Sequence, residues 1–87
     1  YEPDFVVETS HTIYMIEVKA ERDIENADVL EKANAGKIFC DEATNFNLKN
    51  NGKRWKYVLI PHNVILLNMN LESLMDEYLF LGQNDGM

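Results

Sequence analysis

The sequence lacks the features of a disulfide-stapled secreted domain, a membrane protein or a free-standing nucleic-acid binder. It has one cysteine, Cys40, and so cannot form an internal disulfide. No apolar run approaches the roughly 18 residues of a membrane span. Only eight basic residues stand against fifteen acidic ones, and the net charge of -7 argues against a domain that grips DNA through its own phosphate contacts. These absences favour a domain of a reducing compartment, with the cytoplasm as the default.

The length fits one domain over residues 1–87, because chains usually reach about 100 to 150 residues before they form a second hydrophobic core. A chain this short buries only about 60 to 65% of its unfolded surface, so we expect another region to stabilise it. The sequence also enters a strand almost at once after Tyr1. We therefore expect this domain to be part of a larger protein.

Two segments rich in β-branched and aromatic residues, 5–7 and 12–19, are predicted strands. The few residues between them allow only a tight turn, which predicts an antiparallel hairpin. If Ser10 and His11 form that turn, counting back along both strands places Asp4 opposite Glu17.

The rest of the chain predicts a helix, a strand and a second helix. The helix spans Asp28 to about Ala43, with Asp28 as its N-cap and one face of small side chains at helical spacing, namely Val29, Ala33, Gly36, Cys40 and Ala43. Residues 45–54 are polar and predict a loop. The apolar run 55–60 predicts a central strand, reached by a crossover onto the same sheet. A final helix starts after Asn70, with Gly82 as its stop, and the whole predicts an α/β fold with a mixed sheet.

Three charged side chains converge at the end of the predicted hairpin. Glu17 and Lys19 are two residues apart on a strand and project from one face, while Val18 points to the other. Asp4 and Glu17, directly opposed, would repel each other unless a cation lies between them. Carboxylate oxygens suit Mg²⁺, and a metal with an ammonium beside it can activate water and stabilise charge on a phosphoryl oxygen. The constellation favours phosphodiester hydrolysis.

The segment Pro3-Asp4-Phe5-Val6-Val7, followed by Glu17-Val18-Lys19, resembles the motif of the PD-(D/E)XK nucleases. Over residues 1–61, including Lys32-Ala33, Cys40 and the run from Trp55 to Pro61, the chain resembles the C-terminal endonuclease domain of Type III restriction enzyme Res subunits. The resemblance implies a restriction-endonuclease-like fold and the activity of a Type III site-specific deoxyribonuclease. The opening helix and first strand of that core are not evident before Tyr1.

The resemblance also implies roles and partners. Asp4 and Glu17 would be metal ligands, the backbone carbonyl of Val18 another, and Lys19 would position or polarise the attacking water. It further implies Mg²⁺, double-stranded DNA as substrate, a prokaryotic cytoplasm, an upstream helicase region that uses ATP, and a methyltransferase (Mod) subunit. These partners would supply most of the basic surface, and no membrane is involved.

Other interpretations stay open. The domain could be a nuclease-shaped scaffold or interaction module without activity, or another nuclease of the same superfamily that acts in repair or recombination. Lys32 is a weaker candidate for a phosphate contact, since a lysine on a helix flank usually faces solvent. Trp55 and Tyr57 alternate as sheet-covering residues do, and Cys40 is interpreted as a packing residue. Glu8 is expected to be solvated.

Overall fold

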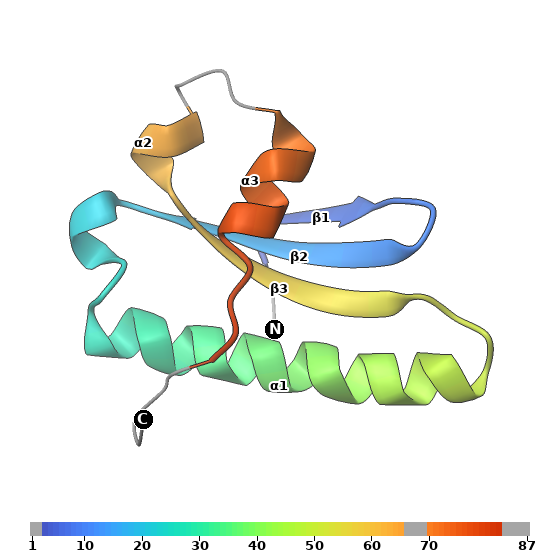
Figure 1. The fold of residues 1–87 in the computed structure, drawn as a ribbon. Coiled ribbons are helices and arrows are strands. Elements are labelled where there is room, and N and C mark those ends of the chain that lie inside the picture. Colours follow the sequence, from blue (N-terminus) through green and yellow to red (C-terminus); the bar gives the residue numbers. More distant parts are fainter. Residues whose placement is uncertain (1–2, 66–69, 83–87) are drawn as a thin grey trace.

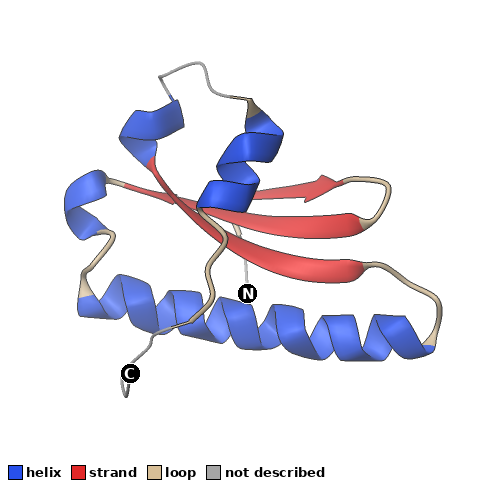
Figure 2. Cartoon of the chain, in the orientation of Figure 1, coloured by secondary structure: helices blue, strands red, loops and turns tan. Residues whose placement is uncertain are grey.

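A sheet separates one long helix from two short ones in the computed structural model of the chain, which describes residues 3–65 and 70–82 (Figure 1). Within these residues the elements, which Figure 2 distinguishes by colour, are β1 (Phe5–Glu8), β2 (Thr12–Lys19), the 3-10 helix η1 (Glu21–Asp23), α1 (Ala27–Lys49), β3 (Arg54–Pro61), α2 (His62–Ile65) and α3 (Leu71–Glu77). The predicted α/β class is thus confirmed. No helix in the described part of the chain is long and apolar enough to cross a bilayer.

The sheet has the strand order β1-β2-β3, with β1 antiparallel and β3 parallel to β2. The Thr9 amide donates to the Thr12 carbonyl at 2.8 Å, so Ser10 and His11 form the predicted two-residue turn. The prediction that the strand at 55–60 is central was wrong, because β2 occupies the middle. The apolar run of β3 has another cause: both of its faces are covered, and Leu79 bridges antiparallel to Val58 along its outer edge.

The long helix α1 begins earlier and ends later than the sequence predicts. Its N-cap is Asn26, whose side chain accepts a hydrogen bond from the Asp28 amide, so the prediction of Asp28 as the cap was wrong. Its C-terminal turns extend through residues predicted as loop. They are held by contacts distant in sequence: the Thr44 hydroxyl accepts from the Trp55 amide at 2.8 Å, and the Asn47 side chain donates to the Lys53 carbonyl.

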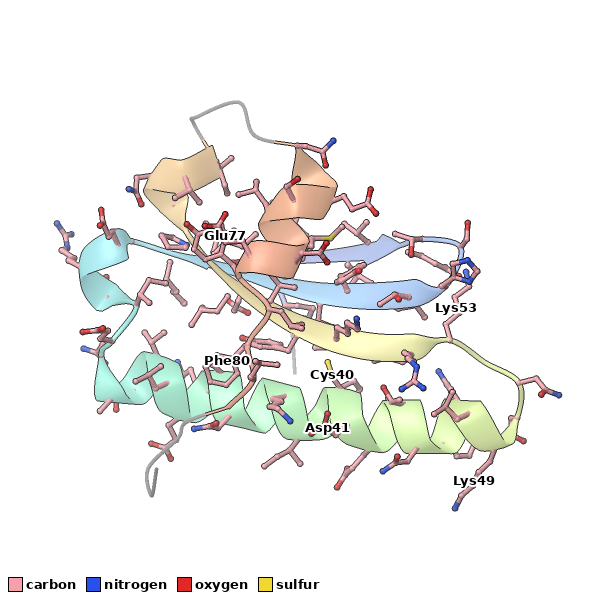
Figure 3. The ribbon with its side chains drawn as sticks, in the orientation of Figure 1. Cys40, Asp41, Lys49, Lys53, Glu77 and Phe80 are labelled. Carbon is pink, nitrogen blue, oxygen red and sulfur yellow. The ribbon has the colours of Figure 1, made fainter. Side chains whose placement is uncertain are left out.

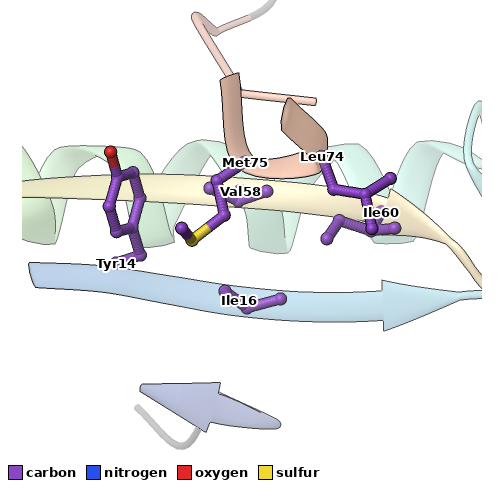
Figure 4. Packing of buried hydrophobic residues seen from close by; sticks show 6 residues of the cluster. All are labelled: Tyr14, Ile16, Val58, Ile60, Leu74 and Met75. Atoms are coloured by element: carbon purple, nitrogen blue, oxygen red, sulfur yellow. The ribbon is translucent and has the colours of Figure 1, made fainter. Parts of the chain in front are cut away.

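One hydrophobic cluster lies between the sheet and α3 (Figure 4). It consists of residues with even numbers on the strands, which share one face, and of two residues from α3; its members are Tyr14, Ile16, Val58, Ile60, Leu74 and Met75. The helix α3 begins at the predicted cap, where the Asn70 side chain accepts from the Ser73 amide. It does not continue to Gly82 as predicted. It ends at Glu77 because the Tyr78 carbonyl turns to accept from the Leu59 amide of β3.

A second cluster lies between the sheet and α1, and its buried members are Met15, Ala33, Cys40, Tyr57 and Leu59. The small-residue face predicted for this helix is confirmed at its centre, since Ala33, Gly36 and Cys40 are buried. The helix packs mainly against β3, and the ring of Phe80 contacts the ring of Tyr57 edge-on. Figure 3 shows Phe80 between the sheet and α1. On this face of the sheet, the part next to β1 is not covered by α1.

Candidate active site

The hairpin has the register that the sequence predicts. Phe5 lies opposite Ile16 and Val7 opposite Tyr14, and the same count places Asp4, immediately before β1, opposite Glu17. Opposed residues of an antiparallel pair project from the same face. Glu17 therefore belongs to the face of the sheet that also carries Met15 and α1, whereas Asp4 lies in a bend one residue before β1.

Asp4 is fastened to the end of β2 by a hydrogen bond that the sequence does not reveal. The backbone amide of Val18 donates to Oδ2 of Asp4 at 2.8 Å. This contact fixes one carboxylate oxygen beside the Glu17-Val18-Lys19 segment and leaves the second oxygen for another ligand. In a strand the N–H and C=O of one residue point to the same neighbour, so the Val18 carbonyl is also directed to the β1 side.

Glu17 and Lys19 lie side by side on this face, as their spacing predicts. The Lys19 Nζ is 3.8 Å from Oε2 of Glu17, and the two side chains are 37% and 14% exposed. That separation is too long for a hydrogen bond but short enough for electrostatic attraction. The ammonium thus attracts the Glu17 carboxylate while its own N–H donors are not committed to it.

The structure does not bring Lys32 to this group. Lys32 is exposed on α1, in a shallow hollow lined by residues of the same helix, namely Asp28, Glu31, Lys32 and Ala35. The interpretation of Lys32 as solvent-facing fits this position. A phosphate contact from Lys32 would require a substrate that spans from the sheet to the helix.

For Cys40 the structure agrees with the interpretation made from the sequence, and for Glu8 it does not. Cys40 packs as expected: it is 1% exposed, its Sγ lies 3.5 Å from Sδ of Met15, and burial raises the pKa of its thiol to about 11. Glu8 is not simply solvated, because it forms an ion pair with Lys53, whose Nζ also donates to the Thr9 carbonyl. No local pattern predicts this contact between residues 45 positions apart.

The chemistry available at the hairpin end is that of two carboxylates, one backbone carbonyl and one ammonium. Among the described residues, no group of three or more His, Cys, Asp or Glu side chains is placed to hold a metal ion, so a cation here would depend on the Asp4 and Glu17 pair with the carbonyl. The fold defines a small mixed α/β domain. No family model matches the chain, and no match was found among the curated proteins or the solved structures.

Proposed function

We propose that the chain is a Mg²⁺-dependent endonuclease domain that hydrolyses DNA phosphodiester bonds, as part of an ATP-dependent Type III restriction enzyme. The observation that supports this most is the bond from the Val18 amide to the Asp4 carboxylate. It ties the acid that follows Pro3 to the acid-X-lysine segment of β2, which is the juxtaposition that the motif requires.

The donor set fits a hard divalent cation. Asp4 and Glu17 would each offer carboxylate oxygen and Val18 its carbonyl, and Mg²⁺ typically takes one or two carboxylates and keeps several waters. A bound Mg²⁺ supplies Lewis-acid stabilisation and lowers the pKa of a coordinated water. Because Oδ2 of Asp4 already accepts from Val18, this residue is oriented before any ion binds.

Lys19 is the positively charged side chain of the proposed site. Its ammonium lies on the same face as Glu17 and is partly exposed, so it can donate a hydrogen bond to a water or to a phosphoryl oxygen. In the proposed reaction it orients the attacking water and stabilises the negative charge that develops on the phosphoryl group.

The setting of this activity follows from the resemblance and from the charge of the chain. A domain with a net charge of -7 needs basic surface from elsewhere to hold DNA. In the proposal, an upstream ATP-using region and a methyltransferase subunit supply it in the prokaryotic cytoplasm. The chain alone is then expected to bind DNA weakly.

The proposal is tested with Asp4→Asn, Glu17→Gln and Lys19→Met. Asparagine at position 4 keeps an oxygen acceptor for the Val18 amide and removes only the charge. We expect Asp4→Asn and Glu17→Gln to weaken Mn²⁺ binding to the chain, measured calorimetrically, at least about tenfold. In the full-length enzyme we expect each of the three changes to lower the DNA cleavage rate about 100-fold or more while ATP hydrolysis persists.

Glu31→Gln is the matched control, since it removes one exposed carboxylate of α1 away from the hairpin. It should leave Mn²⁺ binding and cleavage unchanged. Undiminished cleavage by the Asp4 or Glu17 variant, in a protein that still unfolds at the wild-type temperature, would contradict the proposal.

A second candidate, an interaction module without nuclease activity, is favoured by a different observation. Phe5 and Val6 of β1, the two residues that follow Asp4, are 59% and 56% exposed, and exposed apolar side chains of this kind are typical of an interaction surface. A folded chain that binds no Mn²⁺ would favour this candidate over the nuclease.

A further inference from the structure

The strand β1 has an apolar sequence although one of its edges is free. Within residues 3–65 and 70–82, its only partner in the sheet is β2. Its two most exposed apolar side chains, Phe5 and Val6, project to opposite faces. Apolar residues on both faces are typical of a strand inside a sheet, and a free edge of this kind is a template for another strand.

The backbone groups on the free edge can be identified from the hairpin. The Thr9 amide donates to the Thr12 carbonyl and the Thr12 amide to Thr9 Oγ1, so the two residues face each other, and residues that bond to the partner strand alternate along an antiparallel ladder. Val7 and Phe5 therefore bond to β2, whereas the N–H and C=O groups of Val6 and Glu8 point away from it. These outward groups are available to an added strand.

Beside this edge, on the α3 face, lies an apolar cavity of about 360 Å³. It is bounded by β1, β2, β3, α2 and α3, and its lining includes Phe5, Val7, Ile16, Ile60, Ile65 and Leu74. A strand added to β1 would direct every second side chain over this cavity. Those side chains must be apolar to gain from the contact.

The charges around the edge indicate which residues should alternate with the apolar ones in the partner segment. No lysine or arginine occurs in β1, α2 or α3, and α3 exposes only acidic charges, those of Glu72, Asp76 and Glu77. Toward the other face of β1, Glu8 follows Val6 and Asp4 precedes the strand; Lys53 pairs with Glu8, and Lys19 lies beside Glu17 on the neighbouring strand. A second copy paired about Val6 would set Asp4 of one copy against Glu8 of the other, which is unfavourable.

We propose that the outer edge of β1 binds an extended partner segment in which apolar residues alternate with lysine or arginine. The apolar residues cover the cavity on the α3 face, and the basic ones lie on the face of Asp4 and Glu8. This surface shares Asp4 with the proposed metal site, but the pairing along the edge of β1 does not depend on the proposed chemistry.

The test uses a short, end-capped peptide of alternating valine and lysine with a fluorescent label, titrated with the chain and followed by anisotropy. We expect saturable binding, and no binding of a peptide in which glutamate replaces lysine. Val6→Pro removes the outward N–H without removing a bond to β2, and should weaken binding about tenfold. Val6→Thr keeps this N–H and should bind like the wild type.

A peptide N-methylated at both its valines and its lysines, so that neither strand direction leaves a donor toward β1, provides a test that leaves the protein unaltered, in case Val6→Pro does not fold. It should also bind about tenfold more weakly, because it cannot donate to the Val6 and Glu8 carbonyls. Equal binding of the basic and acidic peptides, or full binding of the N-methylated peptide, would overturn the proposal. A third result would also overturn it: dimers of the wild type and of Val6→Thr in analytical ultracentrifugation, with Val6→Pro monomeric. A second copy of the chain would then be the partner of this edge.

Discussion

Gly36 determines how closely α1 approaches the sheet, because its Cα faces the ring of Tyr57. A Cβ at this position would lie 2.5 Å from Cε1 and 2.8 Å from Cδ1 of that ring. We expect Gly36→Ala to lower the free energy of unfolding by about 1 to 3 kcal/mol, although alanine is the better helix former by about 1 kcal/mol. Urea denaturation measures the change. In the double variant with Tyr57→Leu the ring is gone, so the two effects should not add.

Cys40 gives the fold a defined response to alkaline pH. Burial, followed by the nearby charge of Asp41, raises the pKa of its thiol from 9.0 to about 11, while Lys37 opposes the shift. Between these values the unfolded thiol ionises and the folded one keeps its proton, so stability falls as pH rises. The loss is at most about 3 kcal/mol. Urea denaturation of the wild type and Cys40→Ala across this window should show a shallower decline for the variant; parallel curves would contradict this.

At the scale of the elements, the start of α1 offers a direct comparison of two neighbouring residues. The Asn26 side chain caps the helix, whereas Asp28 contributes its backbone amide and a charge in the first turn. Asn26→Ala should therefore cost about 1 kcal/mol of stability, and Asp28→Asn only a few tenths, measured by thermal unfolding. A larger loss for Asp28→Asn would show that the cap lies where the sequence alone suggested.

The elements that local rules specify were predictable, and those that distant contacts specify were not. A two-residue turn and the alternation of side chains fix the hairpin register, so Phe5 and Ile16 could be paired from the sequence. The end of α1 could not, because Thr44 bonds to Trp55 across the layer. The apolar run of β3 indicated burial correctly, but not that a C-terminal segment at Leu79 would cover its edge.

For the molecule as a whole, the same division applies to the candidate site. The shared face of Glu17 and Lys19 followed from spacing alone, and the position of Asp4 opposite Glu17 followed from the register. The bond from the Val18 amide to Asp4 did not, since it depends on how the chain bends just before β1. Composition indicated the acidic character of the chain. It did not indicate that β1, α2 and α3, none of which contains lysine or arginine, would surround the same cavity.

The antiparallel bridge between Leu79 and Val58 makes the two margins of the sheet unequal. Amides and carbonyls along part of β3 are already engaged by residues 78–80, through the bonds from Leu59 to Tyr78 and from Phe80 to Tyr57. Fibrils in which subunits add edge to edge require every subunit to have two unpaired sheet edges. Among the described residues, the outer edge of β1 is open whereas the middle of β3 is covered, so we expect edge-to-edge stacking through β3 to be hindered.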